Sequence, residues 1–181
     1  MREHGLRTGL FTSPHLTSVT ERIVVDGEPL SPRRFVEVWE DVYPYVQVVD
    51  AELAETGQSQ LSFFEVLTGV AFAAFADTPV DVAIVEVGMG GEWDSTNVVD
   101  AEVAVVTPVA LDHERWLGST LEEIATVKSG IVKEGATVVS AAQRPEVEEV
   151  LRGSPGRLEV VRSSPTVLVD AAHNAAGAEA L

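Results

Sequence analysis

The feature that most constrains the fold is the segment Asp81–Val87, an almost unbroken run of apolar, mainly β-branched residues. A strand with one face in water alternates apolar and polar residues, whereas a strand buried on both faces of a parallel sheet is apolar throughout. We therefore expect Asp81–Val87 to be a buried strand in a parallel sheet that helices cover.

The rest of the chain extends this pattern. Glu102–Thr107 and Thr137–Ser140 are further strand-like runs, and the segment Leu121–Val132 between them has a helical pattern. Strands that alternate with helices are typical of an α/β domain with a mainly parallel sheet. Upstream, Arg7–Thr12 is expected to be a short strand, and Glu21–Asp26 an extended segment that ends at a turn.

Two helices are expected between these upstream strands and Asp81. Ser31 followed by Pro32 predicts a helix start, and Pro44 is expected to end or kink that helix. A second, apolar helix is expected from Ser62 to Phe75.

Composition excludes several classes of function. With 12 basic and 29 acidic residues the formal charge is −17, which repels nucleic acid and anionic membranes. The absence of cysteine removes disulfides, thiolate metal sites and thiol nucleophiles. No apolar run approaches the roughly 20 residues that span a membrane, and the first residues do not resemble a signal peptide. We expect a cytoplasmic protein.

The sequence with the most chemical content follows the first buried strand. Glu86 stands at the end of Asp81–Val87, and a glycine-rich turn, Gly88–Gly91, comes next. Ligands bind at the carboxyl ends of parallel strands, and a carboxylate there is a ligand that Mg²⁺ prefers. The alternatives are a solvated glutamate and the nucleotide-binding turn of a Rossmann-type methyltransferase. The methyltransferase is disfavoured because the next strand ends in Thr107-Pro108, without an acidic residue to bind ribose.

Two later residues are candidates for the same metal site. His113 follows Asp112 just beyond a strand end, where a neutral imidazole can bind a metal. An exposed loop histidine is the alternative. Lys128 lies in a helix two residues before Gly130, and glycine weakens a helix by roughly 1 kcal/mol. Close approach of another group is one reason for that glycine, and Lys128 is otherwise a surface charge.

Together these motifs resemble the folylpolyglutamate/dihydrofolate synthase family, in family order and over nearly the whole chain. They are Gly9–Leu16, Phe63–Glu65, Glu86–Gly91, Asp94–Asn97, Asp112–His113 with Leu117–Gly118, and Lys128–Ile131, followed by Gly156–Arg157 and Asp170–Asn174. The resemblance implies the α/β fold of a Mur-ligase-like central ATPase domain over residues 1–152 and the start of a C-terminal ligase domain over residues 153–181. Sister ligases of cell-wall synthesis are not expected to carry both of the first two motifs.

The resemblance also implies an activity and a set of site residues. The activity is ATP-dependent ligation of L-glutamate to a folate or dihydropteroate carboxylate through an acyl phosphate, by a monomer. Glu86 would bind a first Mg²⁺ and His113 a second, and a carbamylated Lys128 would be an anionic metal ligand. His113 and Lys128 are also the implied catalytic residues. Pterin contacts are implied for Ser62, Phe63, Phe64, Glu65, Trp93, Asp94 and Ser95, and ATP contacts for Arg157 and Asp170. Ser62 and Glu65 are also spaced as a helix capping box, which needs no substrate.

One family motif does not occur in these residues. The 181 residues contain no phosphate-binding loop of the type Gly-Thr-x-Gly-Lys-Gly-Ser, and a long family segment between Leu151 and Arg157 is expected to be deleted. We therefore expect the chain alone not to hydrolyse ATP or to ligate glutamate. The alternative is a non-catalytic remnant that binds folate.

Overall fold

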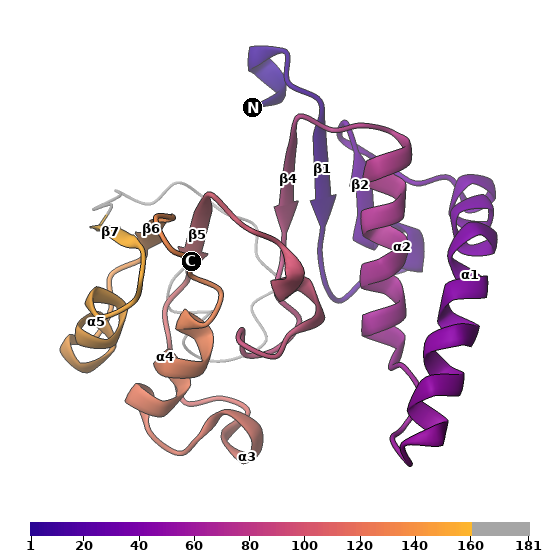
Figure 1. Cartoon of the computed structure of the whole chain (residues 1–181). Coiled ribbons are helices and arrows are strands. Elements are labelled where there is room, and N and C mark those ends of the chain that lie inside the picture. The colour runs from indigo at the N-terminus through magenta and orange to yellow at the C-terminus, as the bar shows by residue number, and fades with distance from the viewer. Residues whose placement is uncertain (161–181) are drawn as a thin grey trace. The chain divides into compact units, whose positions relative to one another are not determined.

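The computed structural model describes residues 1–160, in two compact units that are treated separately below. Unit 1 is Met1–Gly88, and unit 2 begins at Met89. Both combine strands and helices, which confirms the α/β class (Figure 1). The predicted ATP contact Asp170 lies outside the described residues.

Unit 1 is built on a four-stranded sheet with the order β3-β2-β1-β4. β1 and β4 are parallel, while β2 is antiparallel to both β1 and β3. Asp26 and Gly27, with φ of 52° and 88°, form the two-residue turn between β2 and β3, the backbone that a tight hairpin requires. The strands are β1 (Thr8–Phe11), β2 (Ile23–Val25), β3 (Glu28–Pro29) and β4 (Val82–Val85).

Helix α1 (Pro32–Glu55) begins where the sequence predicts, since the Ser31 side chain accepts a hydrogen bond from the Arg34 amide. It continues through Pro44, so Pro44 does not end the helix, and the alternative expectation, a kink at Pro44, stays a prediction. Proline removes one helical hydrogen bond and leaves the others in place. The half beyond Pro44 is also tied down, because Asp50 accepts the Leu61 amide at 2.8 Å.

Helix α2 (Phe63–Asp77) runs alongside the strands of this sheet, and α1 lies next to it (Figure 1). Its buried face joins the two innermost strands and α1 in one apolar core. The buried members of that core are Phe11, Ile23, Leu30, Val38, Leu67, Val70, Ala71, Ala74 and Phe75. Because Phe11 is the last residue of β1 and packs against Phe64, this core fixes the N-terminal end of α2 against the C-terminal end of β1.

The expectation that Asp81–Val87 is a buried strand is half right. Val82–Val85 form β4 in parallel with β1, but Ile84 is 43% exposed. The reason is position: β4 is the edge strand of its sheet, so one side of it has no neighbouring strand in unit 1.

Unit 2 is built on a parallel sheet with the order β5-β6-β7. Helices α4 and α5 pack on it through Ile124, Ala125, Val147 and Leu151, which bury against Val138 of β6. The strands are β5 (Val103–Val106), β6 (Thr137–Ser140) and β7 (Arg157–Val160), and the helices are α3 (Glu114–Leu117), α4 (Leu121–Ser129) and α5 (Pro145–Arg152).

The domain boundary expected after residue 152 falls within unit 2. β7, which starts at Arg157, pairs with β6 of the same sheet. The assignment of 153–181 to a second domain stays a prediction. Within residues 1–160, no helix is both long and apolar enough to cross a membrane.

Candidate functional site

Glu86 lies at the carboxyl end of the parallel pair β1 and β4, as predicted. Its side-chain Oε2 accepts a hydrogen bond from the Ser13 amide at 2.6 Å, and its own amide donates to the Phe11 carbonyl at 2.9 Å. Glu86 therefore connects the end of β4 to the loop that leaves β1. Its side chain is exposed at this edge, where ligands of α/β proteins bind.

Two adjacent phenylalanines at the start of α2 have different environments. The Phe64 ring stacks on Phe11 with centroids 5.6 Å apart, and a Cβ added to Gly88 would lie 2.5 Å from Phe64. Gly88 is thus required for the backbone to pass the Phe64 ring. Phe63 is 60% exposed and lies beneath the Arg22 guanidinium. Phe63, rather than Phe64, presents an accessible aromatic ring at this edge.

Ser62 and Glu65 form the capping box that their spacing predicts. The Ser62 Oγ accepts the Glu65 amide at 3.3 Å, and the Glu65 carboxylate accepts the Ser62 amide at 2.7 Å. Hydrogen bonds from Ser62 lower the pKa of Glu65. The capping role is observed, and the pterin contacts of both residues stay predictions.

The loop after β1 is held by a residue that sequence reasoning missed. The Glu21 carboxylate accepts the amides of Leu16, Thr17 and Ser18, at 2.9, 3.1 and 2.8 Å respectively. The Leu16 and Ser18 amides lower the pKa of Glu21. The available signal was the spacing Ser18-x-x-Glu21, which is a capping box for the 3₁₀ helix η2 (Val19–Arg22).

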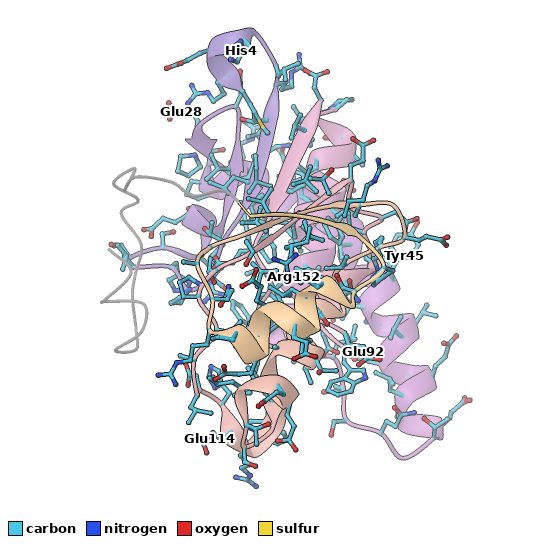
Figure 2. All side chains as sticks on the ribbon, turned by 90° about the vertical axis from the view of Figure 1, so that its left-hand side faces the viewer. His4, Glu28, Tyr45, Glu92, Glu114 and Arg152 are labelled. Atoms are coloured by element: carbon cyan, nitrogen blue, oxygen red, sulfur yellow. The ribbon has the colours of Figure 1, made fainter. Side chains whose placement is uncertain are left out.

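In unit 2 the glycine-rich turn packs against the end of α4. A Cβ on Gly91 would lie 2.7 Å from the Val127 carbonyl oxygen, and one on Gly130 would lie 2.7 Å from the Cα of Glu92, which is labelled in Figure 2. Asn97 joins the two segments by donating to the carbonyls of Glu92 and Gly130, each at 3.1 Å. The prediction that Gly130 permits close approach of another group is confirmed.

The predicted substrate residues of this turn differ in role. Trp93 is 72% exposed and available for contact. Asp94 accepts the amides of Met89 and Thr96 at 2.9 and 3.0 Å, so its carboxylate holds the turn. Ser95 begins the 3₁₀ helix η3 (Ser95–Val98) directly after Asp94. The contacts expected of these residues with a pterin stay predictions.

His113 and Lys128, both in unit 2, lie around Asp112. His113 has a left-handed backbone with φ 51°, a conformation of non-glycine residues that clusters at functional sites. The Asp112 Oδ2 lies 4.0 Å from the His113 Nε2. Burial lowers the pKa of Lys128, and the Asp112 carboxylate partly opposes that shift. Asp112 thus acts on both candidate metal ligands, although it was not itself predicted to be one.

Sequence comparisons identify the family. The "Dihydrofolate synthase/folylpolyglutamate synthase" of Mycobacterium tuberculosis is 35% identical over 97% of this chain and 56% of its own length. The Bacillus subtilis protein of the same description is 40% identical over 84% of this chain and 35% of its own length. This chain belongs to the folylpolyglutamate/dihydrofolate synthase family. No family model matches it.

Solved structures of the same family agree. Mycobacterium tuberculosis folylpolyglutamate synthase complexed with ADP and AMPPCP superposes with a TM-score of 0.81 and 44% identity, over 87% of this chain and 37% of the other. A folylpolyglutamate synthase complex with AMPPCP and folate superposes with a TM-score of 0.78 and 36% identity, over 87% of this chain and 39% of the other. The chain thus spans about half, or less, of the length of these relatives. The Mycobacterium tuberculosis sequence alignment runs over 271 positions against a chain of 181 residues, so it contains gaps in this chain, as an internal deletion requires.

The three predicted Mg²⁺ ligands are divided between the units. Glu86 belongs to unit 1, while His113 and Lys128 belong to unit 2. Within residues 1–160, no group of three or more histidine or acidic side chains is arranged to hold a metal, and the metal-binding roles of Glu86, His113 and Lys128 stay predictions. Arg157, the predicted ATP contact, is exposed at the start of β7.

Proposed function

We propose that these residues belong to a ligase that joins L-glutamate to a folate or dihydropteroate at the expense of ATP. The substrate carboxylate attacks the γ-phosphorus of ATP, ADP leaves, and an acyl phosphate forms. The neutral amine of L-glutamate then attacks the acyl carbon, forming the C–N bond of the amide and losing one proton, while the C–O bond to the phosphoryl group breaks and inorganic phosphate leaves with the former carboxylate oxygen. The family membership and the named ATP-analogue and folate complexes of its relatives support this proposal.

The observation that carries the proposal is the family membership; the structure adds that Lys128 is half-buried near the end of α4, close to Asp112. Burial lowers the pKa of Lys128, so a larger fraction of the amine is neutral than for a lysine in water. A neutral amine attacks CO₂, forming an N–C bond and releasing one proton, which converts a cation into an anionic carbamate. We propose that Lys128 is modified in this way.

The modified lysine would add an anionic oxygen ligand. Glu86 would bind a first Mg²⁺ and His113 a second, with the Lys128 carbamate as a further metal ligand, and Mg²⁺ binds carboxylate-type oxygens together with substrate phosphates. The metal ions would supply charge neutralisation at the transferring phosphoryl group. The chain's own residues position the ligands: the Ser13 amide orients Glu86, and Asp112 lies beside both unit 2 ligands.

Ligation is tested with a chimera in which residues 1–152 replace the matching segment of the Bacillus subtilis enzyme, which is 40% identical over 153 residues. We expect the chimera to add glutamate to dihydropteroate or tetrahydrofolate with ATP and Mg²⁺. A folded chimera that lacks this activity, beside an active parent enzyme, would contradict the proposed function.

The carbamate has a test that does not depend on activity. The chain contains only two lysines, Lys128 and Lys133. With ¹³C-bicarbonate, the 181-residue chain should show a carbamate carbon resonance that is lost in Lys128→Arg and kept in Lys133→Arg. Lys133 is a suitable control because its ammonium donates to the Asn97 carbonyl at 2.9 Å. A resonance that survives in Lys128→Arg comes from Lys133 or the α-amino group of Met1 and would refute the assignment.

A further inference from the structure

Arg22 is a basic residue at the edge of unit 1 that neither the motifs nor the proposed reaction uses. Its backbone carbonyl accepts the Thr12 amide at 3.0 Å, which places Arg22 beside the end of β1. The next residue, Ile23, is fully buried and anchors the start of β2. The Arg22 side chain thus emerges at the edge where Glu86 and the start of α2 lie.

The Arg22 guanidinium is fixed by two contacts. Its Nε donates to the His15 Nδ1 at 2.9 Å, and its central carbon lies 5.4 Å from the centroid of the Phe63 ring. His15 in turn belongs to the loop that Glu21 holds through the adjacent amide of Leu16. A half-buried arginine ordered in this way loses little side-chain entropy when it binds a ligand.

The donors that remain on Arg22 are those of its two terminal nitrogens. Within residues 1–160, neither nitrogen has a hydrogen-bond or ion-pair partner. The contrast with Arg33, Arg34 and Arg152 is clear, because each of those pairs with a glutamate. Arg22 is held by a neutral imidazole instead, so its full positive charge stays available in a chain of net charge −17.

The neighbouring groups define the ligand. The two terminal nitrogens of an arginine form a planar fork that matches a carboxylate. Because His15 accepts at Nδ1, its proton is on Nε2, which supplies a further donor. Phe63 offers an exposed aromatic ring next to the fork, which suits the flat ring that bears the carboxylate rather than the pterin contact that the resemblance implies for Phe63. The carboxylates of Glu21 and Glu86 already accept backbone amides.

We propose that Arg22, positioned by His15 and Phe63, binds the carboxylate of an aryl carboxylate substrate of the pteroate type. The inference rests on the proposed function. It deepens that function by naming a residue that distinguishes a substrate with a charged carboxylate from its neutral amide. Glu86 approaches the same edge from β4 through its hydrogen bond to Ser13, so the bound carboxylate lies where activation is proposed.

The test compares pteroate with pteroic amide, which differ in the one charge that Arg22 recognises. Calorimetric titration of the 181-residue chain should show about 10- to 100-fold tighter binding of pteroate, the range for charge-assisted hydrogen bonds. Arg22→Gln should remove that preference and leave the affinity for the amide within about twofold. Arg22→Lys keeps the charge without the fork and should retain a preference of only a few-fold. L-Glutamate serves as a third ligand.

The outcomes separate the inference from the function on which it rests. Arg33→Gln makes the same charge change at an exposed arginine of α1 and should leave the pteroate preference unchanged. If Arg22→Gln and Arg22→Lys both lose affinity for pteroate and for pteroic amide to the same extent, Arg22 only supports the fold and the proposal is overturned. An undiminished preference in Arg22→Gln also overturns it, as does a loss confined to L-glutamate. Failure of the wild-type chain to bind pteroate refutes the inference, while the chimera tests ligation independently.

Discussion

Replacement of Gly130 by alanine tests the close packing of the glycine-rich turn on α4. Gly130 caps α4 with φ −60° and ψ −12°, a right-handed conformation that alanine adopts readily. At an open site this change would stabilise the fold by about 0.4–1 kcal/mol. Here the new Cβ would lie 2.6, 2.7 and 2.9 Å from the Cβ, Cα and N of Glu92. Two of these atoms are backbone, so the turn itself must move.

The expected result is a net destabilisation. Overpacking costs typically about 1–3 kcal/mol, which outweighs the conformational gain and leaves a loss of about 1–2 kcal/mol. Gly153→Ala is the matched control, since Gly153 also caps a helix in a right-handed conformation and its added Cβ meets nothing nearer than 3.4 Å. Urea unfolding followed by tryptophan fluorescence, through Trp93 and Trp116 of unit 2, measures both. A Gly130→Ala chain as stable as Gly153→Ala would refute the packing argument.

Two further predictions concern the candidate metal ligands and the capping glutamate of α4. In the active chimera, Glu86→Gln or His113→Ala should reduce glutamate ligation at least 100-fold, because loss of a residue that only supports a metal ligand already costs about 10- to 100-fold. Retained activity in both variants would overturn the metal assignment. Glu123 accepts the amides of Ser119 and Thr120, the Ser119 bond foremost, and its pKa is lowered. The ionised Glu123 carboxylate therefore stabilises the folded state above the ordinary glutamate pKa of about 4.3, and this stabilisation is lost as pH falls through the lowered pKa. Glu123→Gln should flatten the fall in the urea midpoint between about pH 5 and pH 3; an unchanged slope would refute this.

Local sequence rules predicted the parts of the fold that depend on neighbouring residues. Ser62 and Glu65 cap α2 as their spacing indicates, and Asp26-Gly27 makes the expected turn. Burial was less predictable, because it depends on which strand has a neighbour. Ile84 is apolar and in a strand, yet it is 43% exposed at an edge. The Arg22–His15 pair was not foreseen, since a seven-residue separation in a loop has no periodic signature.

The acidic character of this chain has a structural use that bears on how its site variants are interpreted. Several carboxylates of the two units accept hydrogen bonds from backbone amides and so hold loops in place: Glu21, Glu86, Asp94 and Glu123. A loss of activity on changing Glu86 thus has two possible origins, a lost metal ligand or a released Ser13 loop. Glutamine keeps an acceptor oxygen for the Ser13 amide but loses the charge, whereas alanine loses both. If Glu86 acts chiefly on the metal, both variants abolish ligation while Glu86→Gln retains pteroate affinity. If it chiefly holds the loop, Glu86→Gln remains active and only alanine weakens pteroate binding.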